Sequence, residues 1–338
     1  MVTPILRFDV TTGDWVAFPV GRADRPVGFA SVPSIRPTTA YDDNCPFCAG
    51  QEMNTPDAVD IEPDPDAPDQ WSVRAFANRY PALAPDAPME RQNHGELFRA
   101  MGGRGAHEVV VESRHHSRPL ALQPVDQVLR LVRLLHRRAR ALSADTSLEV
   151  VQIFKNHGRS AGSSLPHPHF QILAAPVVPR QIRTRYAVAA EYYHAHGESL
   201  YSALLRAELD DGSRVVLENE HYVAFAPFAS RVPYETWIVP RAPSPAFGLA
   251  QANTLPGLAE VMHGLLYRLH VALDDSAYNL TVNGAPRRHV DEPDFIWHME
   301  ILPRVSAIAG FEFATGMAIN SVLPEAAAEQ LRQAVADT

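Results

Sequence analysis

The chain has 338 residues, of which 46% are hydrophobic and 20% are charged, and its formal net charge at pH 7 is −9. This composition is ordinary for an enzyme of one large or two modest domains, and the acidic balance argues against broad affinity for nucleic acid, which requires clustered cations. No apolar run approaches the roughly 18 residues of a membrane span. The N-terminus lacks the features of a secretory signal, which predicts a cytoplasmic location.

The first motif along the chain is Cys45-Pro-Phe-Cys48, which contains the only two cysteines. Two thiolates at this spacing are common in tetrahedral zinc sites, which need two further ligands. The candidates are His115 or His116, which follow a predicted strand, and His167. A redox pair is the alternative, but the thioredoxin-like context of such pairs is missing here. We therefore predict a zinc site.

Apolar residues at helical spacing and β-branched runs predict the secondary structure of the rest of the chain. Valine, leucine and alanine recur at intervals of three and four between Val125 and Leu142, which indicates one amphipathic helix. In chain order we expect a solvated loop at 56–69, a strand at 107–113, a helix at 125–142, strands at 148–156 and 167–175 around a small-residue loop, a helix at 180–205, a strand at 234–241, a helix around 258–269, and strands at 278–284 and 297–303.

The order strand, helix, strand, loop, strand occurs twice. His298 follows His167 by 131 residues, and Glu300 follows His169 by the same 131, so that H-M-E takes the place of H-P-H. The connection between the last two strands of each half is too short for a crossover helix, which favours antiparallel pairing over a doubly wound parallel sheet. We predict an α+β fold in which each half is a mostly antiparallel sheet with helices packed on it. The two related halves are residues 1–185 and 186–338.

The strongest chemical signal is the segment from Ser163 to Gln171, S-S-L-P-H-P-H-F-Q. Residues two apart in a strand face the same side, so His167, His169 and Gln171 are expected to form one polar row. Two histidines that hydrogen-bond at a sheet edge are the alternative. A neutral imidazole can attack phosphorus directly and leave again, which makes His169 the candidate nucleophile.

Gln171 can hydrogen-bond a phosphoryl oxygen, but it cannot donate a titrating proton or activate water. Transfer of the phosphoryl group is therefore favoured over hydrolysis. The loop between Asn156 and Ser164 contains two glycines and several hydroxyls. Its backbone N–H groups and side chains are candidates to hold the phosphates.

Three segments, C-P-F-C-A-G, E-S-R-H-H-S-R-P-L and G-S-S-L-P-H-P-H-F-Q, resemble the galactose-1-phosphate uridylyltransferase family of the histidine triad superfamily in order and spacing. The resemblance runs nearly end to end. It implies His169 as the nucleophile, oriented by the backbone carbonyl of His167, and Gln171 as the residue that holds the phosphate. The zinc ligands that it implies are Cys45, Cys48, His116 and His167.

The same resemblance implies contacts to the nucleotide and its phosphates from Asn78, Asn156 and Ser164, and to the diphosphate from Arg25. Loop capping is the alternative for Asn78 and Ser164, and a solvated surface position is the alternative for Arg25. No residue in the sequence distinguishes uracil from adenine.

Members of this family commonly have a second metal site made of a carboxylate and three histidines, and this chain departs from that pattern. Arg185 stands about where the carboxylate would be, Asn283 and Glu300 replace two of the histidines, and only His298 remains. We therefore do not predict iron. The tail G-F-E-F-A-T-G-M-A-I-N is closer to the branch that contains ADP-glucose phosphorylase.

The predicted reaction is ping-pong, in which His169 attacks the α-phosphorus of a nucleoside diphosphate sugar, releases sugar 1-phosphate and passes the nucleotide to a second phosphate. A hexose 1-phosphate as acceptor gives a uridylyltransferase, and inorganic phosphate gives a phosphorylase. The rivals are a nucleotide hydrolase, which Gln171 disfavours, and a non-catalytic nucleotide-binding or zinc-stabilised protein, which the H-P-H-x-Q motif disfavours. Relatives suggest a homodimer, and neither nucleic acid nor a membrane is an expected partner.

Overall fold

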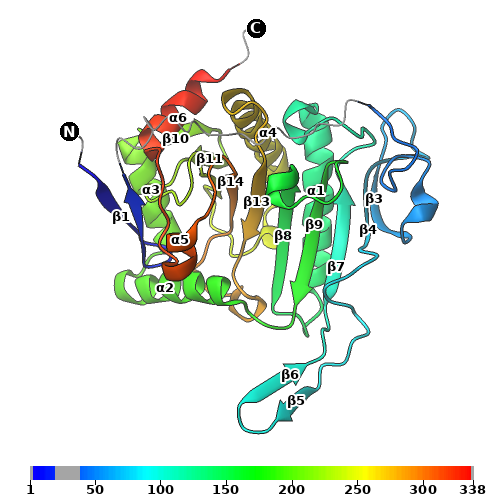
Figure 1. Cartoon of the computed structure of the whole chain (residues 1–338), viewed down its shortest axis with the longest axis horizontal. Coiled ribbons are helices and arrows are strands. Elements are labelled where there is room, and N and C mark those ends of the chain that lie inside the picture. Colours follow the sequence, from blue (N-terminus) through cyan, green and yellow to red (C-terminus); the bar gives the residue numbers. More distant parts are fainter. Residues whose placement is uncertain (1–2, 20–38, 336–338) are drawn as a thin grey trace.

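A computed structural model describes residues 3–19 and 39–335 of the chain. Ten strands form one antiparallel sheet that runs through the whole molecule, with helices packed on it (Figure 1). The predicted α+β fold with antiparallel pairing is confirmed. From edge to edge the strands are β10 (Val215–Glu218), β11 (Tyr222–Phe225), β12 (Thr236–Pro240), β14 (His298–Pro303), β13 (Tyr278–Asn283), β8 (Val150–His157), β9 (His169–Ala175), β7 (Ala106–Val111), β4 (Trp71–Ala77) and β3 (Ala58–Pro63).

The two halves of the chain meet at the centre of this sheet, where β8 pairs with β13. Ile153 lies opposite Val282 in this pairing. On its other side β8 pairs with β9, and β13 pairs with β14, so the sheet is continuous from one half to the other. The boundary near residue 185 falls inside a helix, α2 (Arg180–His196), and the division into two domains stays a prediction.

One face of the sheet is covered by two long helices, α1 (Val125–Ser143) and α4 (Leu255–Ala272), which pack side by side (Figure 1). The apolar stripe of α1, which includes Leu131 and Leu135, is fully buried. Full burial of one such side chain contributes about 1.5–3 kcal/mol to stability. Phe170 of β9 faces the same core, so the neighbouring residues of β9 lie on the opposite face of the sheet.

The opposite face is covered at its two ends. Over the C-terminal half, α2 and α3 (Leu200–Asp211) pack on β11 and β12, and Val223 and Trp237 belong to that second core. Over the N-terminal half, the segment around Cys45 packs on β4 and β7. Between these two covers, β8 and β13 form the floor of a cavity of about 460 Å³. Phe154 of β8 lines this cavity and is opposite Gln171 in the register of β8 with β9, two residues from the candidate nucleophile His169.

The sequence predicts one helix over 180–205, and this prediction is wrong. Two helices, α2 and α3, are separated by a turn at Gly197, whose φ is 73°. Glycine ends helices in this left-handed conformation because it has no Cβ to clash with the backbone. The glycine after His196 was the signal that should have ended the predicted helix.

The prediction of a solvated loop at 56–69 is wrong for residues 58–63, which form the edge strand β3 and pair with β4, whereas residues 64–69 are irregular. The acidic residues of β3 are held by an arginine of α1. Arg137 lies 2.9 Å from Asp60 and also forms an ion pair with Glu62. Charged side chains are common on edge strands, where they discourage pairing with other chains.

The remaining elements lie outside the ten-stranded sheet. Among them, the hairpin of β5 and β6 projects from the body of the molecule (Figure 1). Within the described part of the chain, no helix is both long and apolar enough to cross a membrane. These elements are β1 (Ile5–Asp9), β2 (Asp14–Phe18), β5 (Arg91–His94), β6 (Phe98–Met101), α5 (Gly310–Thr315) and α6 (Pro324–Gln333).

Candidate active site and metal centre

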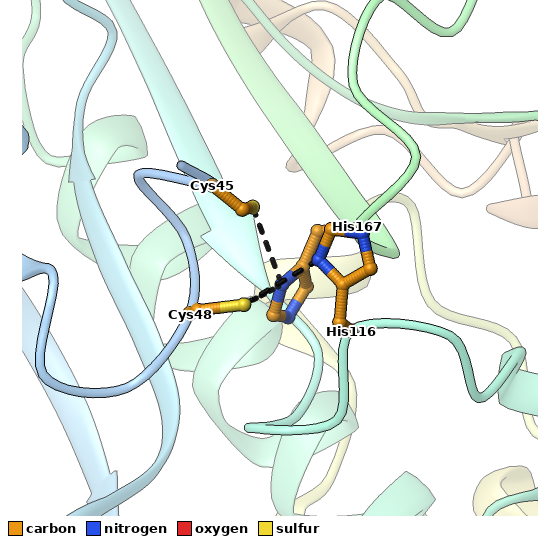
Figure 2. Close-up of side chains that lie close together, drawn as sticks. All are labelled: Cys45, Cys48, His116 and His167. Carbon is orange, nitrogen blue, oxygen red and sulfur yellow. Dashed lines mark hydrogen bonds between the residues drawn. The ribbon is translucent and has the colours of Figure 1, made fainter. Parts of the chain in front are cut away.

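Two cysteines and two histidines form a buried cluster at the head of β9. Cys45 and Cys48 lie on the loop that covers β4 and β7, His116 follows β7, and His167 precedes β9 (Figure 2). One ligand atom from each residue lies within 4.8 Å of the others, and all four side chains are buried. Two thiols and two imidazoles at this separation fit a tetrahedral zinc ion. The cluster of four residues thus joins three distant parts of the chain.

The hydrogen bonds of His167 support its place in this cluster. Its Nε2–H donates to the backbone carbonyl of Ser113 at 2.9 Å, so Nδ1 keeps the lone pair, and Nδ1 lies 3.7 Å from the sulfur atoms of both cysteines. A carbonyl that fixes the tautomer of a ligating histidine is usual in zinc sites. Burial raises the pKa of the Cys45 thiol to about 11, so a bound metal would displace its proton.

The position after a predicted strand left His115 and His116 open as the third ligand, and the family resemblance implied His116. His116 is 2% exposed and its Nδ1 lies 3.4 Å from the sulfur of Cys48, whereas the neighbouring His115 is exposed. The geometry therefore favours His116. His167 departs from the predicted polar row, because it precedes the strand and faces the thiols.

His169 is the first residue of β9 and is 6% exposed. Its Nδ1 lies 2.8 Å from the backbone carbonyl oxygen of His167. Because a carbonyl can only accept a hydrogen bond, Nδ1 carries the proton and Nε2 keeps its lone pair. Burial, aided by the charge of Lys155, lowers the pKa of His169 to about 4, so the ring is neutral. A nucleophilic imidazole requires this state.

Gln171 lies on the same face of β9 as His169, and a histidine that the sequence analysis did not single out holds its side chain. His107 Nδ1 accepts the backbone N–H of Ala82 at 3.1 Å, so its proton is on Nε2, which donates to Gln171 Oε1 at 2.8 Å. The oxygen of Gln171 is therefore occupied, and its NH₂ group remains to donate to a phosphoryl oxygen. The register of β8 with β9 pairs Lys155 with Phe170, so its continuation by one residue brings Asn156 opposite His169 on this face. The sequence signal for His107 is a polar residue near the start of a strand that ends in three valines.

The other predicted contacts are less closely tied to the nucleophile. Asn78 has its Nδ2 3.2 Å from His107 Nε2, and its Oδ1 accepts the backbone N–H of Tyr80 at 2.9 Å, which is the loop-capping alternative. Ser164 is exposed on the loop between β8 and β9. Arg25 lies outside the described residues.

A buried ion pair lies behind the strand that carries the nucleophile. Lys155, the only lysine of the chain, is 1% exposed and pairs with the fully buried carboxylate of Glu112. Its ammonium lies 5.4 Å from the centre of the Phe170 ring, on the helix-covered side of β9. Lys155 is also opposite Phe170 in the register of the two strands. The ammonium of Lys155, balanced by the carboxylate of Glu112, thus lies behind the strand that carries the nucleophile.

Removing one charge of this pair is expected to destabilise the protein more than removing both. Glu112→Gln leaves the ammonium of Lys155 buried without a carboxylate and should lower the free energy of unfolding by about 3–5 kcal/mol. The double variant Glu112→Leu with Lys155→Met keeps the volume and should lose much less. Urea unfolding of the three proteins measures the difference, and equal losses in the single and double variants would contradict it.

The C-terminal half carries a structural counterpart of this site, and it corrects the sequence register. His298 is the first residue of β14, as His169 is of β9, and its Nδ1 lies 3.1 Å from the carbonyl oxygen of Ile296. Each imidazole therefore donates to the carbonyl two residues before it. His298 matches His169, and Glu300 matches Gln171, at a spacing of 129 residues rather than the predicted 131.

This counterpart is closed by aromatic rings and ion pairs. His298 is fully buried and stacks on Trp237 at 4.7 Å between ring centres. Glu300 is paired with Arg185 at 2.7 Å and with Arg231 at 2.9 Å. Burial alone would raise the pKa of Glu300, but the two guanidinium groups hold it well below its usual range. Arg185, which the resemblance places about where the metal-binding carboxylate would be, thus neutralises Glu300 together with Arg231.

Comparison with known proteins agrees with the resemblance read from the motifs. The sequence model described as the N-terminal domain of galactose-1-phosphate uridyl transferase matches residues 2–179, and a domain of unknown function (DUF4921) matches 92–338. The ADP-glucose phosphorylase of Arabidopsis thaliana is 33% identical over 98% of this chain and 93% of its own length. The galactose-1-phosphate uridylyltransferase of Thermotoga maritima is 29% identical over 97% of this chain and 98% of its own.

A solved structure shows the same fold over the whole chain. The crystal structure of an ADP-glucose phosphorylase from Arabidopsis thaliana with bound ADP-glucose superimposes with a TM-score of 0.83, at 30% identity and with complete coverage of both chains. The resemblance to both branches, predicted from the H-P-H-F-Q segment and the tail, is confirmed.

Proposed function

Because this chain belongs to the galactose-1-phosphate uridylyltransferase family, we propose that it transfers a nucleoside monophosphate from a nucleoside diphosphate sugar to a second phosphate by way of His169. The observation that carries the proposal is the state of this histidine. Its Nδ1–H donates to the backbone carbonyl oxygen of His167, with 2.8 Å between nitrogen and oxygen, and its ring is neutral. The lone pair of Nε2 is therefore available for attack.

In the first step Nε2 of His169 attacks the α-phosphorus and forms a P–N bond, while the P–O bond to the sugar phosphate breaks. The electron pair leaves with the bridging oxygen as sugar 1-phosphate, which is a good leaving group without protonation. The NH₂ group of Gln171 donates to a non-bridging oxygen whose charge increases in the transition state. In the second step an oxygen of the acceptor phosphate attacks phosphorus, the P–N bond breaks and His169 is regenerated.

We propose zinc as the metal of the cluster, held by Cys45, Cys48, His116 and His167. A zinc ion in a closed four-ligand site supplies structural stability rather than Lewis acidity. Its effect on the reaction is to fix the residue whose carbonyl orients His169. His167 therefore connects the cluster to the nucleophile, because its side chain belongs to the cluster and its backbone oxygen accepts the hydrogen bond of His169.

Two acceptors follow from the two branches of the family. A hexose 1-phosphate makes the enzyme a uridylyltransferase of the galactose-1-phosphate type. Inorganic phosphate makes it a phosphorylase, and the 33% identity to the Arabidopsis thaliana ADP-glucose phosphorylase supports this second candidate. In both reactions the entering group is a phosphate oxygen, so Gln171 suffices where hydrolysis would need a group that activates water.

The deciding experiment measures the intact mass of the protein after mixing with UDP-glucose, UDP-galactose, ADP-glucose or GDP-mannose, each without acceptor. We expect a nucleotide-sized adduct whose mass identifies the base. Adding galactose 1-phosphate or inorganic phosphate in separate samples should then discharge the adduct, and the acceptor that does so names the reaction.

The alternatives give different results in the same experiment. A hydrolase would release free nucleotide steadily without acceptor, and a binding protein would give no adduct with any donor although it is folded and contains zinc. A homodimer and a cytoplasmic location stay predictions.

A further inference from the structure

The open face of β8 and β13 continues from the nucleophile into the C-terminal half. Lys155 of β8 pairs with Phe170 of β9, so the next residue of β8, Asn156, comes opposite His169 when this register is continued by one residue. Asn279 of β13 is opposite Asn156 in the register of β8 with β13. Arg304 follows β14 and lines the same cavity of about 460 Å³ as the two asparagines. Three polar side chains thus form a row that starts at the catalytic face and ends in the other half of the chain.

Direct hydrogen bonds connect this row. Nε of Arg304 donates to Oδ1 of Asn279 at 2.6 Å. Nδ2 of Asn279 then donates to Oδ1 of Asn156 at 2.8 Å and to the backbone carbonyl of Ala161 at 2.9 Å. Each acceptor and each donor of the Asn279 amide therefore has a partner.

Only one direction of this chain is chemically possible. A guanidinium has no acceptor atom, so it must donate, and the atom of Asn279 that meets it must be the oxygen. The NH₂ group of Asn279 then faces Asn156, so the atom of Asn156 that meets it must be the oxygen as well. The NH₂ group of Asn156 is left to face the loop, where a Cβ built on Gly162 would lie 3.8 Å from Nδ2.

The same asparagine ties down the loop that follows β8. The Ala161 carbonyl is part of the turn at Arg159–Ala161, which the chain enters through Gly158 with a φ of 81°. A Cβ on Gly158 would come within 2.7 Å of Ala277, so the loop lies directly against the C-terminal half. This loop is the segment that we predict to hold the phosphates.

We propose that Arg304 and Asn279 form a relay that fixes the amide of Asn156 with its NH₂ group toward the substrate phosphate. The two are positioning residues, because they act on the substrate through the amide of Asn156 and not by contact with it. The inference rests on the proposed nucleotidyl transfer. It gives the C-terminal half a role in catalysis: it sets the direction of a hydrogen bond in the N-terminal half.

The test begins with a variant that removes the donor group of the Asn279 side chain while keeping its size. Asn279→Asp keeps the size and the bond to Arg304, but its carboxylate cannot donate, so the NH₂ group of Asn156 turns toward it and away from the substrate. Loss of one oriented donor lowers kcat by roughly 10²–10³-fold, and we expect a decrease of about 10²-fold in the rate of adduct formation. Asn279→Ala repeats the test without an added charge.

Variants at Arg304 test whether a side chain that can only donate a hydrogen bond is needed at this position, or whether a side chain of similar size is enough. Arg304→Lys retains a side chain that only donates and should keep most of the rate, whereas Arg304→Met should lose about 10-fold, since the amide of Asn279 is then free to turn over. The matched control is Asn283→Ala, on the same strand and the same cavity wall but outside the relay. It should stay within about twofold of the parent protein.

A double-mutant cycle gives the result that a structural role would not produce. Once Asn156→Ala has removed the amide, Asn279→Ala should slow adduct formation by less than about twofold more, because coupled residues are not additive. Additive losses, or full activity in both Asn279 variants with unchanged melting temperatures, would overturn the relay. No adduct in the parent protein would instead overturn the proposed function, so the two failures are distinguishable.

Discussion

His169→Ala is expected to reduce nucleotide transfer by at least about 10⁴-fold and to remove the covalent adduct entirely. Loss of a nucleophile costs on this order, because the remaining contacts bind the substrate but cannot form the intermediate. The side chain is held by one hydrogen bond to the His167 carbonyl and an edge contact with the Phe47 ring at 5.3 Å. Its removal should therefore leave the fold intact. Intact mass and radiolabel exchange between the donor and sugar 1-phosphate measure the loss.

The matched control is His115→Ala, since this histidine is exposed and stands next to the predicted ligand His116. It should retain full activity. An adduct that persists in His169→Ala would show that another residue is the nucleophile. Loss of the adduct together with a large drop in melting temperature would be a folding effect, and circular dichroism of the variant separates the two.

The second large effect is expected at the metal cluster. Cys48→Ser or removal of zinc by a strong chelator should lower the free energy of unfolding by at least about 5 kcal/mol, since metal-binding free energy in such sites contributes directly to folding. For a chain of this size, this corresponds to a decrease of roughly 7 °C in melting temperature. Activity should fall with it, because the carbonyl that orients His169 belongs to the ligand His167.

Elemental analysis of the purified protein is the direct check of this expectation, with one zinc per chain as the expected value. Cys45→Ser, Cys48→Ser, His116→Ala and His167→Ala should each reduce the zinc content, whereas His115→Ala should not. A chelated protein with unchanged melting temperature and activity would contradict a structural metal. A protein that holds full zinc after loss of Cys48 would show that the cluster is not its binding site.

The parts of the site that the sequence predicted are those whose chemistry is local. C-x-x-C and H-P-H-x-Q bring their donors together within a few residues, and the strand after the loop fixes which face each residue takes. The local pattern alone did not separate His115 from His116, because neighbouring residues share every local signal and differ only in burial, and the prediction of His116 depended on the family resemblance. The alternation of residues in a strand also could not show that the His167 side chain points toward the thiols and away from the face that His169 and Gln171 share.

The residues that were missed act across the sheet. His107 reaches Gln171 from the neighbouring strand, and Asn279 reaches Asn156 from the other half of the chain. Such contacts depend on strand register, which the sequence gives only where a motif repeats. The spacing of 131 illustrates this. It aligned His167 with His298, whereas the first residues of β9 and β14 align His169 with His298.

The burial of Lys155 also determines how the protein responds to amine chemistry. Lys155 is the only lysine of the sequence and is 1% exposed, so the folded molecule shields its single ε-amine from acylating reagents. An acyl group can be added to this amine only in a molecule whose sheet has opened. The fraction of chains that carry a label on Lys155, read by peptide mass, therefore measures the fraction of opened molecules.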